Sequence, residues 1–447
     1  QKVLNSNSSR IYNATTTAAA SDITLTNQVS GETLQLSNSA ATSSKNVGSY
    51  SITNLSGVTI SNQSGANASS GALAANYTLT GGTHSFAINP KAVNIAGSRQ
   101  YNGITNIASS DISGITGTVN TETLTMSSGL GSTASANVGT YNLTDTSAGT
   151  LALGNGSNGG LASNYTLTGG TQDYTITQRV LNSSGSKTYD ANTNALAGAI
   201  TLSNLVSGEA LNHSGTATIS SANAGSYTIS NLSGISIADG SGGAASNYTL
   251  TGGTHNFTVN RRVVGVSGTR LYDATTNAVA SDLSTHANLV GSQTLNLSGT
   301  GTIASKNVGS NKTVSVGTLA LADGSNGGLA ANYTLTGGTH QLTVNQRPLN
   351  ATLARQYDGT TASAGSTLSS FNALQGGETL TMTGSGTAAS ANVANGITMS
   401  SNGNLALANG TGAASNYSLN STVINVTKRV LNSSGSKTYD ANTNALA

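Results

Sequence analysis

The sequence predicts an all-β fold that is repeated in tandem along the chain. One observation is that a tyrosine motif and two cation positions recur about every 85 residues. Another is that short segments alternate apolar and polar side chains, as strands do. The third is composition, because charged residues make up only 7% and hydrophobic residues 36% of the chain. Disordered chains usually carry a higher net charge than the +2 found here, so we expect folded modules with small cores.

Two tyrosine motifs mark each repeat. In the first, the tyrosine is followed by Asp or Asn, and in the second it lies between Asn and Thr or Ser. Together they hold eleven of the fifteen tyrosines, so we interpret these rings as structural anchors. The first column comprises Tyr12, Tyr101, Tyr189, Tyr272, Tyr357 and Tyr439, and the second comprises Tyr77, Tyr165, Tyr248, Tyr333 and Tyr417.

The basic residues also form two columns. One cation opens each repeat, and a second lies two residues before the first-column tyrosine. Lys and Arg interchange in both, which favours a role that needs only charge and a long stem, such as covering a ring or pairing with a surface carboxylate. Since arginine cannot form a Lys-Asn isopeptide bond, neither column is a general cross-link site. The columns are Lys2, Lys91, Arg179, Arg262, Arg347 and Arg429, and Arg10, Arg99, Lys187, Arg270, Arg355 and Lys437.

Local patterns predict the strands. Residues 123–126 and 294–297 place every second side chain on an apolar face, and residues 333–336 and 342–344 flank a Gly-Gly turn. We expect about six to eight short strands per module, at the spacing of a small Ig-like β-sandwich. A β-grasp-like module or a β-solenoid gives similar patterns, although solenoid coils repeat at about 20 to 50 residues. No long helix is expected.

The repeats set the predicted domain boundaries. Residues 86–95 and 257–263 join consecutive modules through strand formers, without a flexible spacer, so we expect a stiff rod. Residues 179–197 and 429–447 are identical, which indicates recent duplication and a slice of a longer chain. The predicted modules 1 to 5 are 1–89, 90–177, 178–260, 261–345 and 346–427, and 428–447 begins a sixth.

Two motifs resemble those of a known repeat class. Residues 355–361 read Arg-Gln-Tyr-Asp-Gly-Thr-Thr, and residues 327–340 contain Asn-Tyr-Thr-Leu-Thr-Gly-Gly-Thr-His. They resemble the YDG and MBG type repeats of filamentous haemagglutinin-like adhesins, which leave bacteria by two-partner secretion. The resemblance implies an extracellular protein of the cell surface or biofilm matrix, an outer-membrane secretion partner, and repeats that act as extension or matrix elements. It implies no catalytic residues. Most copies have Ala in place of Gly359, a departure that affects turn chemistry.

Several site classes find little support. The chain has no cysteine for disulfides or thiolate metal sites, and its small net charge offers no footprint for nucleic acid. No apolar run is long enough to span a membrane in this segment. His84, His255 and His340 follow the same turn, but each module supplies one histidine, and Gln172 replaces it in module 2. We therefore expect exposed turn or strand residues there and no metal or cofactor. The Asp-Gly loops at 239–243 and 323–328 offer one carboxylate each, which favours turns over calcium sites.

The expected function is structural. A Tyr-Asp pair, or a Tyr-Asn pair in the first two copies, occurs in every module and indicates a satisfied ring and a closed turn rather than acid-base catalysis, so we expect no enzyme. The sequence predicts a stalk or matrix fibre whose Thr-rich faces and strand edges permit self-association between chains. The alternative is a module that binds a polysaccharide, such as exopolysaccharide, or a host surface.

Overall fold

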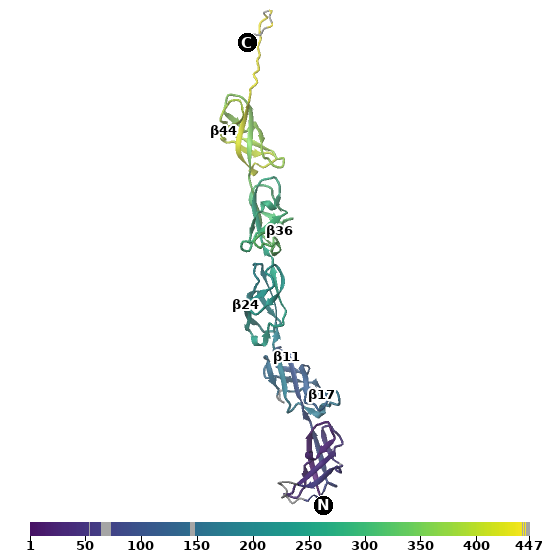
Figure 1. Cartoon of the computed structure of the whole chain (residues 1–447). Helices are drawn as coiled ribbons and strands as arrows, with labels where there is room; N and C mark the ends of the chain where they lie inside the picture. Colours follow the sequence, from purple (N-terminus) through teal and green to yellow (C-terminus); the bar gives the residue numbers. More distant parts are fainter. Residues whose placement is uncertain (53, 64–72, 144–147, 440, 442, 444–447) are drawn as a thin grey trace. The chain divides into compact units, whose positions relative to one another are not determined.

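The computed structural model describes residues 1–52, 54–63, 73–143, 148–439, 441 and 443 (Figure 1). Within these ranges the chain forms β-strands and short 3-10 turns, with no α-helix. Corresponding strands recur in the same order in consecutive repeats, although some are split in two or merged. The predicted all-β tandem fold is confirmed. No helix among the described residues is long and apolar enough to cross a membrane.

Module 1 is a sandwich of a four-stranded and a three-stranded sheet. The four-stranded sheet has the order β4-β2-β9-β6, the other has β3-β5-β7, and β1 pairs with β8. The strands are β1 (Lys2–Val3), β2 (Asn5–Ile11), β3 (Thr17–Ala19), β4 (Leu25–Thr26), β5 (Leu34–Ala41), β6 (Gly48–Ser51), β7 (Val58–Asn62), β8 (Tyr77–Thr78) and β9 (His84–Asn89).

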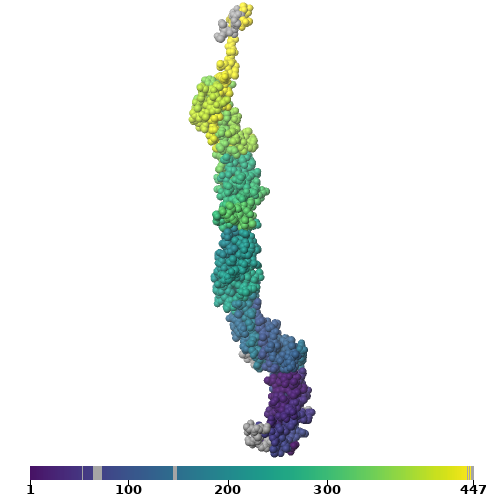
Figure 2. Space-filling view, in the orientation of Figure 1, coloured from purple at the N-terminus to yellow at the C-terminus, as the bar shows by residue number. Residues whose placement is uncertain are grey.

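The core of module 1 follows from alternation along its strands. In β9, His84, Phe86 and Ile88 are buried, whereas the intervening Ser85 is exposed. Phe86 and Ile88 pack in one cluster with small residues such as Ala18 of β3. Successive side chains of a strand point to opposite faces, so this pattern puts one face into the core. The surface of module 1 is the dark purple part of Figure 2.

Module 2 repeats this arrangement. Its four-stranded sheet has the order β13-β11-β19-β16, and β12–β15, β14–β17 and β10–β18 are further pairs. The strands are β10 (Lys91–Ala92), β11 (Asn94–Gln100), β12 (Asn106–Ala108), β13 (Ile112–Thr116), β14 (Leu124–Ser128), β15 (Leu130–Ser132), β16 (Gly139–Asn142), β17 (Ala152–Asn155), β18 (Tyr165–Thr166) and β19 (Gln172–Thr177). Strands β11 and β17 are labelled in Figure 1.

The described chain divides into two compact units. The first comprises Gln1–Ser184, Leu196–Ala217 and Leu232–His255, and the second comprises Gly185–Ala195, Thr218–Asn231 and Asn256–Ala447. The division runs through predicted module 3. Its strands are β20 (Arg179–Val180), β21 (Asn182–Thr188), β22 (Asn194–Leu196), β23 (Ile200–Ser203), β24 (Leu211–Ile219), β25 (Gly225–Asn231), β26 (Ile235–Asp239), β27 (Tyr248–Thr249) and β28 (His255–Asn260). The module boundaries themselves stay a prediction.

The second unit holds modules 4 and 5, each with a six-stranded sheet. The orders are β31-β34-β35-β38-β30-β32 and β40-β43-β44-β46-β39-β41. Module 4 has β29 (Arg262–Val263), β30 (Gly265–Leu271), β31 (Asn277–Val279), β32 (Thr285–Ala287), β33 (Leu295–Ser298), β34 (Thr300–Ile303), β35 (Gly309–Ser315), β36 (Ala320–Asp323), β37 (Tyr333–Thr334) and β38 (His340–Asn345). Module 5 has β39 (Arg347–Gln356), β40 (Ala362–Ala364), β41 (Leu368–Phe371), β42 (Leu380–Thr383), β43 (Ser385–Ala388), β44 (Ala394–Ser401), β45 (Ala406–Asn409) and β46 (Tyr417–Thr427).

The Gly-Gly turn of the repeat lies against the first strands of its module. Gly81 has a φ of 85°, in the left-handed region that favours glycine, and a Cβ on Gly82 would lie 1.9 Å from the carbonyl oxygen of Leu4. Module 5 has Ser-Leu-Asn at this place. There β46 runs unbroken and pairs in parallel with β39 from Tyr417 onward. The glycines therefore allow the sharp break that separates β8 from β9.

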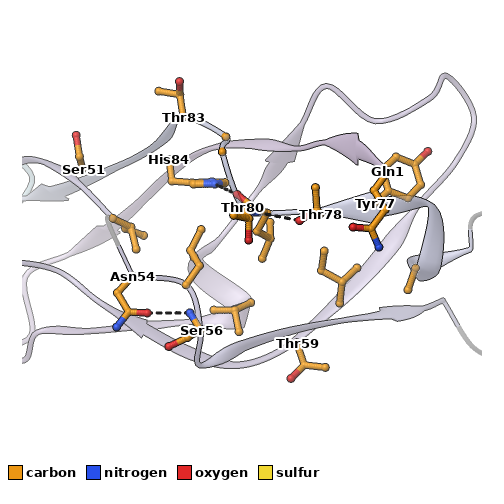
Figure 3. Close-up of a pocket in the computed structure, with 18 of the residues that line it drawn as sticks. Gln1, Ser51, Asn54, Ser56, Thr59, Tyr77, Thr78, Thr80, Thr83 and His84 are labelled. Atoms are coloured by element: carbon orange, nitrogen blue, oxygen red, sulfur yellow. Dashed lines mark hydrogen bonds between the residues drawn. The ribbon is translucent and has the colours of Figure 1, made fainter.

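The repeated histidines are buried, and the prediction of exposed residues is wrong. His84 is 6% exposed, and its ring lies between the hydroxyl of Ser6, at 3.0 Å, and the carbonyl oxygen of Leu79, at 2.9 Å. Figure 3 shows His84 among the residues that line a pocket of module 1. The ring thus satisfies polar groups beneath the Gly-Gly turn. Gln172 does the same in module 2, where its amide donates to Leu167 O at 2.7 Å. Among the described residues no three His, Asp or Glu side chains are close enough to hold a metal ion.

Candidate functional site: the tyrosine junctions between modules

The first-column tyrosine reaches out of its own module. Tyr12 follows β2, and its backbone N–H donates to Asn89 O at the end of the parallel strand β9. Its ring then packs edge-on against Tyr165 of module 2, with ring centroids 5.4 Å apart and an interplanar angle of 77°. Both side chains are buried, at 1% and 5% exposure. The two tyrosine columns of the sequence therefore meet at a junction between consecutive modules.

Four junctions share this edge-on pair. Centroid separations are 5.3 to 5.4 Å and interplanar angles 77° to 78°. Such a pair contributes about 0.5–1.5 kcal/mol beyond the burial of its area. The pairs are Tyr12–Tyr165, Tyr101–Tyr248, Tyr189–Tyr333 and Tyr272–Tyr417.

One carboxylate accepts hydrogen bonds from both rings. The hydroxyl of Tyr12 donates to Glu122 Oε1 at 2.8 Å, and that of Tyr165 donates to Glu122 Oε2 at 2.5 Å. The hydroxyl oxygen of Tyr165 also accepts the N–H of Val119 at 2.9 Å. Glu122 lies in the turn between β13 and β14 and is only 6% exposed. Because a buried carboxylate is stable only when it is hydrogen-bonded, the two hydroxyls are essential to it.

The carboxylate recurs at two of the other junctions. Glu209 accepts from Tyr101 and Tyr248, at 2.6 Å in each case. Glu378 accepts from Tyr272 at 2.6 Å and from Tyr417 at 2.9 Å.

The junction between modules 3 and 4 has an amide in this place. Gln293 donates through Nε2 to the hydroxyl oxygen of Tyr189 at 2.9 Å, and its Oε1 accepts from the Tyr333 hydroxyl. The geometry is kept without a charge. This junction is therefore a natural neutral variant of the other three.

The asparagine of the second motif caps the neighbouring module. The 3-10 turn Ala162–Asn164 places Asn164 so that its Oδ1 accepts the backbone N–H of Val47, at 2.9 Å, across the junction. Its Nδ2 donates to Asn46 Oδ1 at 3.0 Å. Asn164 is fully buried, at 0% exposure. The equivalent asparagines accept from Val138, Ala224 and Val308, and they are Asn247, Asn332 and Asn416.

The opening cation donates hydrogen bonds to backbone carbonyl oxygens at the junction. Arg179 donates to Tyr101 O at 3.4 Å, and its other nitrogens donate to Asn204 O and Oδ1 at 2.5 and 2.8 Å. Arg262 makes the same contacts with Tyr189 O and Asn288, and Arg347 donates to Tyr272 O at 2.6 Å.

The second cation column holds the Tyr-Asp turn. The guanidinium of Arg270 lies 2.9 Å from Asp273, whose Oδ1 accepts the N–H of Thr275 at 3.0 Å. The cation of Arg10 lies over the ring of Phe86, 5.6 Å from its centroid. In this column the contacts confirm the ring-covering and carboxylate-pairing roles predicted from the interchange of Lys and Arg. The arginines of the opening column donate to backbone carbonyl oxygens instead.

Burial at two junctions raises the pKa of a tyrosine. Burial, followed by the hydrogen bond to Glu209, raises the pKa of Tyr101 to about 12, and burial with Glu122 raises that of Tyr165 to about 12. Burial alone would raise the pKa of Glu378. The Lys306 ammonium, 2.6 Å away, and the two tyrosine hydroxyls outweigh it and hold that pKa below its ordinary value.

Comparison with protein families matches this repeat four times. The YDG domain matches residues 2–85, 172–255, 258–343 and 340–424, which together make up well over half of the chain. The chain belongs to the YDG domain family. No curated protein matches it. The tandem YDG modules therefore form a repeat region with a structural or binding role.

The eleven predicted anchor tyrosines of the YDG modules fall into three groups by their surroundings. Eight form the four junction pairs. Tyr77, 4% exposed, donates to Glu32 and accepts the N–H of Val29 within module 1. Tyr357 and Tyr439 are 41% and 91% exposed. Where the ring of the first column pairs with a tyrosine of the next module it is buried, so these tyrosines anchor the junctions between modules.

The predictions from the sequence did not include the glutamates of the YDG modules. The chain has four glutamates, and all four occupy the same place in the repeat. Each stands one residue before Thr or Ala and two before Leu, at the start of a strand. This recurrence, with Gln293 in the fourth copy, was a usable signal, comparable to that of the tyrosines. The column is Glu32, Glu122, Glu209, Gln293 and Glu378.

Proposed function

We propose that this chain is the structural repeat region of a secreted bacterial surface adhesin or biofilm-matrix fibre, in which YDG modules form a stiff extension. The observation that carries the proposal is the junction. At four successive places the same buried tyrosine pair, hydrogen-bonded to one Glu or Gln side chain, joins a module to the next. A spacer region needs interfaces of this kind, whereas a chain of independent binding modules does not.

The strength of the junction contacts supports stiffness. Domains in one chain move relative to each other unless their interface is substantial. Here a hydrogen bond to a charged group contributes about 1.5–3 kcal/mol, and Tyr12 and Tyr165 each make one to Glu122. The asparagine cap and the ring pair add to these. Bending at a junction would expose all of them at once.

The resemblance to filamentous haemagglutinin-like adhesins supports an extracellular site and export through an outer-membrane partner. The absence of cysteine accords with modules that hold together without disulfides. Antibodies against this chain should label intact cells of the source bacterium or their matrix. Labelling that requires permeabilised cells would overturn the localisation.

Electron microscopy of the purified chain tests the extension. Uniform rods with an axial repeat of one module are expected, and small-angle scattering should give a constant cross-section. Compact particles, or chains bent at random between modules, would contradict the proposal. Sedimentation velocity over a range of concentrations shows whether the rods also associate with one another, as a matrix filament requires.

Polysaccharide binding finds less support. Carbohydrate sites usually present exposed aromatic rings, and among the described residues only Tyr357 and Tyr439 are exposed tyrosines. A glycan array probed with the whole chain distinguishes the two functions. Saturable binding that survives in the Tyr357→Ala variant would favour a binding module.

A further inference from the structure

The first and last long strands of a module lie side by side and run parallel. In module 1, β2 pairs with β9 from Ser6↔His84 to Ile11↔Asn89. In module 2, β11 pairs with β19 from Ile95↔Gln172 to Gln100↔Thr177. Module 4 repeats this in β30 and β38, and module 5 extends it over the whole of β39.

This topology fixes how tension would act on a module. The chain enters at the start of the first strand and leaves from the end of the last one. Because the two strands are parallel, a pull on the chain draws the first strand backward and the last strand forward along their common direction. All hydrogen bonds between them are then loaded together. A pull that separated the strands from one end would instead load one bond at a time.

The junction tyrosine opposes the same sliding motion. Tyr272 follows β30 directly, and its ring is held in module 5 by Tyr417 and Glu378. For β30 to slide backward past β38, this ring must leave a site where it is 0% exposed. The far end of the strand is therefore fastened to the module that moves forward under load.

We propose that each YDG module bears tension as a shear clamp between its first and last strands, latched by its tyrosine in the next module. This rests on the proposed extension function and adds a mechanical role to it. The tyrosine is a positioning residue for the first strand. A latch of this kind lets a long extension resist flow or pulling without covalent cross-links.

Single-molecule pulling on the full chain tests the clamp. Each unfolding module should lengthen the chain by roughly 25–30 nm, because an extended chain spans about 3.3–3.6 Å per residue. The chain contains no cysteine, so handles can be attached through introduced ones. Handles at the two ends load the strands in shear. In the Leu271→Cys/Asn345→Cys variant the handles are attached to two paired residues at the same end of β30 and β38. Pulling on them separates the two strands of module 4 one hydrogen bond at a time.

Module 4 should unfold at a severalfold higher force under end-to-end pulling than under unzipping. Equal forces in the two directions would overturn the clamp. Rods seen by microscopy would still support the extension function, so the failure of one proposal is distinguishable from the failure of the other.

The latch is tested by Tyr272→Phe in the same full chain. This variant keeps the ring but loses the hydroxyl bonded to Glu378, and one unfolding event of the series should shift to lower force. Tyr357→Phe is the matched control and should shift none, because the structure gives its hydroxyl no hydrogen bond among the described residues. If Tyr272→Phe impairs folding, Glu378→Gln reproduces the natural amide of Gln293. A force series unchanged in both variants would overturn the latch.

Discussion

At the scale of residues, a junction depends on one acceptor shared by two hydroxyls. Glu122 is buried and its counterparts Glu209 and Glu378 are half-buried, and each accepts hydrogen bonds from tyrosines of two modules. The acceptor and the donors stabilise each other, since either would be costly to bury alone. Substitutions that remove one side therefore cost more than the hydrogen bond itself is worth.

Replacing Glu122 by Ala should lower the free energy of unfolding by about 1–3 kcal/mol, because it leaves the buried hydroxyl of Tyr12 without its partner. Chemical denaturation with tyrosine fluorescence measures this. Glu32→Ala is the control, since Glu32 serves only Tyr77 and should cost less. A loss equal to that of the control would mean that the contact across the junction adds nothing.

The pKa of Glu378 predicts an acid-sensitive junction. Its pKa is lower when folded than its ordinary value of 4.5, so the carboxylate stabilises the fold above that pH. This stabilisation is lost as the pH falls through the folded pKa. The difference in stability between the wild type and Glu378→Gln should shrink from pH 7 toward pH 3. A difference that is constant with pH would contradict the role of the charge.

The tyrosines predict the opposite dependence at high pH. The pKa of Tyr101 is about 12, above its ordinary value of 10, so the contribution of its neutral hydroxyl is complete below pH 10 and is lost as the pH rises through about 12. Ultraviolet titration should show a late tyrosinate fraction. That fraction should decrease in Tyr101→Phe, and an unchanged titration curve would rule out Tyr101 as a member of it.

At the scale of elements, the turn after the junction tyrosine carries strain. Ala274 has a φ of 64°, a conformation that costs an L-residue about 1–2 kcal/mol. Gly359 occupies the same place in module 5, with a φ of 79°. The turn is held in this conformation by the Arg270–Asp273 pair and the hydrogen bond from Thr275.

Ala274→Gly should therefore stabilise module 4 by about 0.5–1 kcal/mol, the relief of strain less the greater entropy of glycine in the unfolded chain. Gly359→Ala is the reciprocal variant and should destabilise module 5 by a similar amount. Thermal denaturation of both checks the signs. Shifts in the same direction would contradict this account.

At the scale of the whole molecule, the stiffness proposed above rests on the junctions rather than on the modules. A ten-residue Gly/Ser insertion after Asn345 separates Tyr272 from Glu378 and Tyr417 and leaves every strand intact. Small-angle scattering should then show a shorter average dimension despite the longer chain. The same insertion within the 323–328 loop is the control, and equal profiles for the two would contradict the proposal.

The sequence by itself determined the tandem all-β fold and the repeat frame. Alternation along segments such as β9 and the period of the tyrosine columns are local or regular signals, and they follow directly from strand geometry. The same alternation put Phe86 and Ile88 in a core. It did not place His84 there, because one of the polar partners that allow its burial, Ser6, lies 78 residues away in the sequence.

Only the tertiary structure decided what the tyrosines do. Tyr12 and Glu122 are 110 residues apart, and nothing in the local pattern of either shows that they meet. A buried tyrosine ring can pack in its own module or against the next one. For Tyr12 the outcome depends on the position of the end of β2, which the ring follows. The glutamate column was visible in the sequence, but its meaning required the two hydroxyls that converge on it from different modules.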